Sequence, residues 1–143
     1  MRGEGPPAQL RLVTTDELSR ATAQTPGMER LAAVSAGTVG SLGLWMGQTV
    51  MDPATRSSDH HHGESETAIF VVSGRPEFVY LDQSVDPPVE RRLRAGPGDY
   101  VYVPPWVPHR EENPDPEDPA VVVIARTTQE AIVVNLPDLG PPG

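Results

Sequence analysis

Prolines and glycines interrupt this chain so often that every apolar run is short. There are 17 prolines and 13 glycines among 143 residues, and most of them lie between apolar runs. Short runs rich in β-branched and aromatic residues are typical of strands, and turn residues at intervals of about ten positions are typical of a β-sandwich or barrel. We therefore expect an all-β fold with strands at 39–51, 67–73, 74–82, 91–95, 98–105, 120–126 and 131–136.

One short helix is expected near the N-terminus, at 14–22, where the sequence reads TTDELSRAT. Thr14 and Glu17 fit a capping box, and Asp16 adds an acidic residue to the first turn. A chain of this length is most simply one domain, which we place at 10–137. The ends, 1–9 and 138–143, are rich in proline and glycine and are expected to be flexible tails.

Composition excludes several classes of function. The net charge is −9, and the only basic cluster is ERRLR at 90–94, so neither nucleic acid nor an anionic membrane is an expected partner. The absence of cysteine excludes disulfides, thiolate metal sites and cysteine nucleophiles. No apolar run approaches the length of a membrane span, and no secretory leader is evident, so the expected location is the cytoplasm.

Three of the four histidines lie together in the stretch SDHHHGESETAIFVVSG, at 58–74. If the chain is already extended at residue 60, alternation places two of them on one face and His61 on the other. The residues expected on that first face are His60, His62, Glu64, Glu66, Ala68, Phe70 and Val72. Imidazole and carboxylate groups together suit iron, manganese, nickel, copper or zinc. A polar loop that is rich in histidine is the alternative interpretation of this stretch.

The fourth histidine belongs to a second motif, GDYVYVPPWVPHREEN, at 98–113. Its order is Gly98, five residues, Pro104, one residue, Trp106, two residues, His109, three residues and Asn113. This order resembles the second motif of the cupin family, except that Trp106 stands where that family has a glycine.

The histidine stretch resembles the first motif of the same family. The residues that fit it are His60, His62, Glu66 and Gly74. Ala54 stands in the place of the motif's leading glycine. Seven residues separate Glu66 from Gly74 where the family has six, so counting back from Gly74 reaches Thr67, and a one-residue bulge is needed to keep Glu66 in place.

The resemblance covers about residues 40–136 and implies a cupin-type jelly-roll barrel, often dimeric, with one divalent transition metal ion per chain. The ligands that it implies are His60, His62, Glu66 and His109. Glu64 competes with Glu66 for the carboxylate position. Glu66 could also leave the metal and act as a general base.

Other residues are expected at the cavity. Phe70 and Val72 are expected to form part of its wall, and Trp106 is expected to cover it, with packing against a second chain as the alternative. These residues and Tyr102 are the expected contacts of a small-molecule substrate. Tyr102 shares a strand face with Tyr100, and which face of that strand lines the cavity is left open by the sequence.

A homodimer is expected from the strand at 67–73. Its residues Ile69 and Val71 are apolar on the face opposite the expected ligands, so the strand needs cover on both sides. A second subunit would supply that cover, and a covering N-terminal segment is the alternative.

Three kinds of function remain open from the sequence. The expectation is a metal-dependent oxygenase acting on a small oxygenated organic molecule, because the ligand spacing is similar to that of quercetinase-like cupins. The first alternative is a redox-neutral cyclase, isomerase or lyase of secondary metabolism, such as a polyketide cyclase. The second is a non-catalytic cupin that binds a small molecule.

Overall fold

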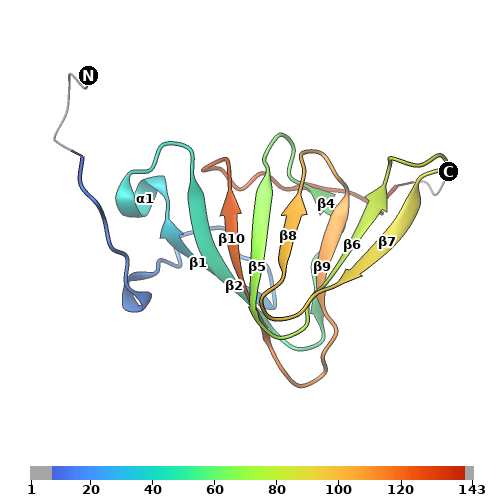
Figure 1. The fold of residues 1–143 in the computed structure, drawn as a ribbon, viewed down its shortest axis with the longest axis horizontal. Helices are drawn as coiled ribbons and strands as arrows, with labels where there is room; N and C mark the ends of the chain where they lie inside the picture. The colour runs from blue at the N-terminus through green and yellow to red at the C-terminus, as the bar shows by residue number, and fades with distance from the viewer. Residues whose placement is uncertain (1–7, 141–143) are drawn as a thin grey trace.

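The computed structural model describes residues 8–140 as two antiparallel sheets. The five-stranded sheet runs in the order β1 (Met28–Val34), β2 (Trp45–Met51), β10 (Ala120–Arg126), β5 (Thr67–Ser73) and β8 (Tyr100–Val103). The other has the order β11 (Val134–Asn135), β4 (His60–His61), β9 (His109–Asn113), β6 (Glu77–Asp82) and β7 (Val89–Arg94), with β3 (Thr55–Arg56) paired to β9. In Figure 1, β9, β6 and β7 stand beside the larger sheet. The expected all-β jelly roll is confirmed.

Two strands begin and end where the sequence predicts, at 67–73 and 120–126. The strand expected at 39–51 is shorter, because 36–39 form the small helix α1 (Ala36–Val39). The Ser35 hydroxyl accepts a hydrogen bond from the Thr38 N–H (3.2 Å), and Gly40 ends the helix with a φ of 72°.

The helix expected at 14–22 is reduced to a single 3₁₀ turn, η1 (Thr15–Glu17). The Thr14 N–H does donate to the Glu17 carboxylate (2.8 Å), as the capping box predicts. The chain then becomes extended at Leu18, and Ser19 exchanges two backbone hydrogen bonds with Ala32 of β1. Pairing with the sheet edge therefore overrides the local helical signal.

The inner face of β5 is formed by the residues that were expected on its outer face. Thr67, Ile69 and Val71 are buried, whereas Val72 is 48% exposed. A core cluster joins residues from both sheets: Ile69, Val71, Phe78, Ala95, Val103 and Val122. The expectation that Ala68, Phe70 and Val72 line the interior is wrong, because a turn at residues 63–64 breaks the extended chain and shifts the alternation by one residue.

The outer face of the five-stranded sheet is partly apolar. The ring of Tyr100 packs against that of Phe70 at a tilt of 51°, with 4.8 Å between ring centroids, and Val72 and Tyr102 are exposed on the same side. This face, and not Ile69 and Val71, is where a second subunit would bury apolar surface. The homodimer itself stays a prediction, since a single chain is described.

If the dimer forms through this face, the double variant Val72→Lys, Tyr100→Lys should be monomeric where the unchanged protein is dimeric. Two charges at the centre of an apolar contact are costly to bury. Light scattering after size exclusion reports the mass directly. A control change on the other sheet, Val89→Lys, should leave the mass unaltered, and dimers that survive the double change would place the interface elsewhere.

Part of the expected C-terminal tail packs on the domain. Leu139 is buried against Val79 and Leu81 of β6, so the chain is anchored at least to that residue. Residues 1–7 of the expected N-terminal tail and residues 141–143 lie outside the described range. Within residues 8–140, no helix has the length and apolar character needed to cross a membrane.

Within residues 8–140, two residues other than glycine have a left-handed backbone, and both stand where the cupin motifs have glycine. Ala54 has a φ of 53° and Trp106 a φ of 68°. A side chain in this region meets steric strain that glycine avoids. The left-handed backbone explains why the cupin motifs have glycine at these two positions. This chain keeps the same backbone conformation with alanine and tryptophan.

Ala54→Gly is therefore expected to stabilise the protein by roughly 0.5–1 kcal/mol, the relief of strain being partly offset by the greater entropy of an unfolded glycine. Chemical denaturation measures the change. Ala36→Gly, at an ordinary helical position, is the matched control and should destabilise. Destabilisation by both changes to the same extent would contradict the strain at Ala54.

Candidate metal centre

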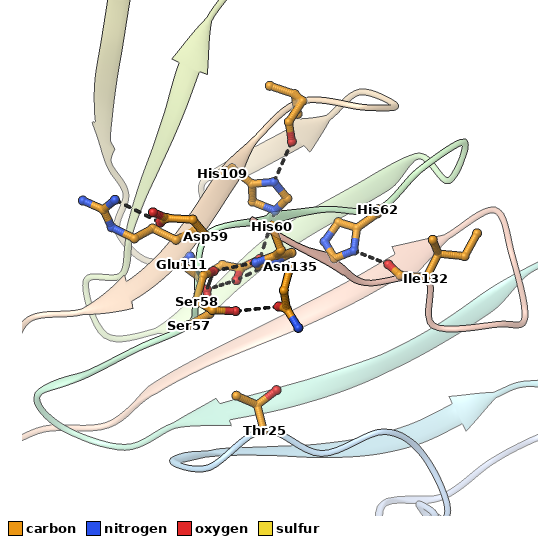
Figure 2. Close-up of polar contacts among 12 residues, drawn as sticks. Thr25, Ser57, Ser58, Asp59, His60, His62, His109, Glu111, Ile132 and Asn135 are labelled. Atoms are coloured by element: carbon orange, nitrogen blue, oxygen red, sulfur yellow. Dashed lines mark hydrogen bonds and ion pairs between the residues drawn. The ribbon is translucent and has the colours of Figure 1, made fainter. Parts of the chain in front are cut away.

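Four side chains converge between β4 and β9 (Figure 2). His60 lies on β4 and pairs directly with His109 on β9, and His62 follows β4. Glu111 is two residues beyond His109, so strand alternation places both on one face. One ligand atom from each of the four residues lies within 4.8 Å of the others.

Hydrogen bonds fix all three imidazole rings in the same tautomer. The Nδ1 atoms of His60, His62 and His109 lie 2.6, 2.8 and 3.1 Å from the backbone carbonyls of Ser58, Ile132 and Val107. A carbonyl can only accept, so each Nδ1 carries a proton, and in the neutral form of each ring Nε2 keeps its lone pair. The outer hydrogen bonds of metal-bound histidines have this form.

Glu111 is held opposite those lone pairs. The Ser57 hydroxyl donates to its Oε2 (2.9 Å), while Oε1 lies 3.3 Å from Nε2 of His109 and Oε2 lies 3.8 Å from Nε2 of His60. Nε2 of His109 is buried and has no hydrogen-bond partner within the described chain. Three imidazole nitrogens and a carboxylate facing one point form a ligand set that could hold a divalent metal ion.

Burial keeps two of the histidines neutral. It lowers the pKa of His62 to about 4, a shift that its hydrogen bond to Ile132 and the charge of Glu111 only partly oppose. It also lowers the pKa of His60. Burial acts on His109 in the same sense, but contact with Glu111 outweighs it and raises the pKa of that ring.

The pKa of the Glu111 carboxyl is lowered. Burial alone would raise it, but the contact with His109 and the neighbouring histidine rings outweigh that effect. Glu111 is therefore an anion throughout the neutral range, and unprotonated Nε2 atoms together with a carboxylate are the forms that bind metal.

Of the ligands that the sequence suggested, the structure brings together the three histidines and leaves the glutamate out. Glu66 is exposed, and its carboxylate accepts a hydrogen bond from the Tyr102 hydroxyl. Glu64 is also exposed. The shift in alternation at the turn puts Thr67 on the interior instead, buried at the cavity wall. Glu66 is thus placed to act neither on a metal in the cluster nor as a base beside it.

Glu111 takes the place that Glu66 was expected to fill, and sequence reasoning missed it. The signal was available, because the pattern His109, one residue, Glu111 in a strand gives the same shared face as His60 and His62.

A cavity of about 460 Å³ opens beside the four residues. Apolar side chains from the five-stranded sheet and from the segment before β11 form one part of its wall: Ile69, Val103, Ile124, Ile132 and Val133. The polar part includes Gln24, Thr25, Arg30, Ser57, Ser65, Thr67, Arg126 and Asn135. A small organic molecule fits a space of this size and mixed character.

None of the four residues expected to contact a substrate lines this cavity. Phe70, Val72 and Tyr102 lie on the outer face of the larger sheet. Trp106 is 63% exposed, and its ring lies 5.6 Å from that of His61, which faces away from the metal ligands as predicted. The error in the strand alternation along β5 explains why Phe70 and Val72 were expected at the cavity. The sequence left open which face of β8 lines the cavity. Val103 is buried and Tyr102 is not, so the tyrosines lie on the outer face.

Two contacts hold β9 in position. Arg110, on the opposite face from His109, donates to Asp59 (3.1 Å) and so ties β9 to the residue before His60. The fully buried amide nitrogen of Asn113 lies 3.0–3.1 Å from the carbonyls of Met51, Asp52 and Asp118. The motif asparagine therefore fixes loops below the cluster and is not part of it.

Comparison with known proteins agrees with this architecture. Residues 47–126, more than half of the chain, match the Cupin domain family. A polyketide synthase, CurC of Streptomyces cyaneus, is 38% identical over 85 residues, which cover 59% of this chain and 50% of that protein. The chain thus spans about half the length of that relative.

Solved structures share the fold at low identity. The polyketide cyclase RemF of Streptomyces resistomycificus has a TM-score of 0.71 at 18% identity, with 90% of this chain and 86% of that chain covered. Oxalate oxidase in complex with glycolate has a TM-score of 0.67 at 17% identity, with coverage of 83% and 62%. A mutant oxalate decarboxylase OxdC of Bacillus subtilis reaches 0.73 at 16%, with coverage of 93% and 33%. With both sequence motifs, two sheets and a three-histidine cluster in one barrel, the chain belongs to the cupin family.

Proposed function

We propose that this protein is a metal-dependent cupin cyclase that acts on a polyketide-type substrate, a linear chain of alternating ketone and methylene groups. The observation that carries the metal site is the common tautomer of His60, His62 and His109, whose three Nε2 lone pairs face the carboxylate of Glu111. Iron, manganese, nickel, copper and zinc all accept this ligand set.

The choice of a cyclase over an oxygenase rests on the comparisons. The curated relative is a polyketide synthase, and one of the solved structures that cover most of both chains is a polyketide cyclase. They support the redox-neutral alternative better than the oxygenase that we expected from ligand spacing. The oxalate enzymes share the fold and leave the substrate open.

The proposed reaction needs no oxidant. A proton leaves a methylene carbon, that carbon forms a bond to a ketone carbon within the same chain, and the ketone oxygen takes up a proton to become a hydroxyl. Loss of this hydroxyl as water, with the second hydrogen of the former methylene carbon, then gives an unsaturated ring. A divalent metal ion would supply Lewis acidity at the ketone oxygens. The chain's own part is to fold the substrate against Ile69, Ile124 and Ile132 and to keep bulk water from the reacting carbons.

The first test is the metal content of protein purified without a histidine tag, beside the double variant His60→Ala, His109→Ala. About one metal ion per chain, lost in the variant, is expected. Metal-loaded protein is then incubated with a synthetic linear poly-β-ketone under nitrogen and in air.

Equal ring formation under both atmospheres supports a cyclase. A product formed only in air, with oxygen consumed, would support the oxygenase instead. Protein that neither contains nor takes up metal would leave a small-molecule-binding cupin, the remaining alternative.

A further inference from the structure

Two arginines face the cavity from the larger sheet. Arg30 comes from β1 and Arg126 from β10, and the strand β2 lies between them. Both are half-buried, and both line the same cavity as His60 and His62. They therefore form a wall across the cavity from the candidate metal ligands.

Arg126 is held by neutral groups alone. Its Nε donates to the carbonyl of Thr128 (2.9 Å) and its Nη2 to that of Gln129 (2.7 Å), and the guanidinium lies 4.0 Å from the centroid of the Trp45 ring. These contacts fix its orientation without neutralising its charge, and they leave Nη1 with no partner among the described residues.

Arg30 is fixed in a similar way. Its Nη1 donates to the Thr25 hydroxyl (2.7 Å), and its backbone N–H and C=O both bond to the side chain of Gln24 (2.8 Å each). Thr25 lies across the cavity from the histidines in Figure 2. Within residues 8–140, the Nε and Nη2 groups of Arg30 have no hydrogen-bond partner.

Neither guanidinium forms an ion pair within the described part of the chain, whereas Arg92 and Arg110 each pair with carboxylates. Glu111 is the one acidic residue among those that line the cavity, and it faces the histidines. Burial, with the charge of Arg30 as a second cause, lowers the pKa of Arg126 to about 10. The charge of Glu111 also acts on Arg30, but without an ion pair. Two arginines that line one cavity without an ion pair, in a chain of net charge −9, indicate a site for an anion.

We propose that Arg30 and Arg126 form a subsite for a carboxylate, and that the substrate is an acid whose carboxylate binds there while its ketone groups extend toward the histidine cluster. Guanidinium groups match the planar geometry of a carboxylate and make charge-assisted hydrogen bonds to it. This inference rests on the proposed function, because it assigns both ends of one substrate to one cavity.

The test compares the binding of naphthoate with that of naphthamide, which has the same ring system without the charge. Calorimetry on metal-free protein excludes direct binding of the carboxylate to a metal. Naphthoate is expected to bind about tenfold or more tightly than naphthamide. Arg30→Gln and Arg126→Gln should each remove that preference. Arg75→Gln should keep it, because Arg75 is exposed beside a separate hollow with Glu77 and Arg94.

Equal affinity for the two compounds in the unchanged protein, or a preference that survives either glutamine change, would overturn the subsite. Arg126→Gln also removes the contact with Trp45, so its folding is checked by thermal melting. If it does not fold, Arg30→Gln alone decides the outcome. Zinc binding by the same samples separates the two proposals, since it tests the metal site and leaves the carboxylate subsite untouched.

Discussion

Replacing Glu111 by glutamine is expected to weaken zinc binding at least about 100-fold, more than the loss of an outer-shell partner usually costs. Glutamine keeps the length of the side chain and can still accept the hydrogen bond from Ser57. It removes the negative charge that faces the three Nε2 atoms. Competition with a chelator of known affinity measures the change.

The matched control is Glu66→Gln, which changes the same residue type at the exposed position that the sequence motif suggested. It should leave zinc affinity unchanged, because the Glu66 carboxylate bonds to Tyr102 on the outer face. A large loss with Glu66→Gln and none with Glu111→Gln would return the ligand role to Glu66 and contradict the arrangement in Figure 2.

A rescue sharpens the same test. Thr67 lies at the position reached by counting back from Gly74, and it is buried at the cavity wall. Thr67→Glu in the Glu111→Gln protein is therefore expected to recover part of the lost affinity. Ala68→Glu, one residue further along and on the outer face, should recover none.

The three histidines could be placed from the sequence because the position of each depends only on a short, regular stretch around it. His60 and His62 are two residues apart, and His109 has its own motif of proline and asparagine. No long count intervenes, so an error in alternation cannot accumulate. The same argument explains why Glu111, two residues from His109, was within reach of sequence reasoning.

Glu66, Phe70 and Val72 were all placed by the same count of alternating residues, and the cupin motif also pointed to Glu66. Their assignment extended the alternation of His60 across residues 63–66, which turn at Gly63 with a φ of 56°. A bulge does occur in β5, between Val71 and Ser73, but it lies beyond the residues in question and does not bring Glu66 inward. Sequence patterns fix the phase of a strand only from its own first residue.

The sequence could not show that the two arginines line the same cavity. Arg30 and Arg126 are 96 positions apart in the chain, and they share a cavity only because β1 and β10 both pair with β2. Strand order, which long-range contacts determine, has no local signature of that kind.

The metal-free protein is expected to lose stability as the pH falls from about 6.5 to about 4. An unfolded His62 takes up its proton near pH 6.5, whereas the folded protein resists protonation until its pKa of about 4. Between these values the unfolded state binds more protons, so acid favours unfolding. The difference between the two pKa values of His62 corresponds to a change of roughly 3 kcal/mol at most in the free energy of unfolding. The pKa of His60 is also lowered, so His60 acts in the same direction.

The neighbouring groups make His62→Gln the decisive comparison. Contact with Glu111 raises the pKa of His109, so its contribution is present in acid and is lost as the pH rises, opposite in sign to that of His62. The lowered pKa of Glu111 adds a loss of stability at still lower pH. Because glutamine cannot titrate, the variant should lose less stability than the unchanged protein between pH 6.5 and 4, as measured by denaturation at several pH values. Parallel curves for the two proteins would mean that His62 takes up its proton as readily in the folded protein as in the unfolded one, which would contradict the lowered pKa.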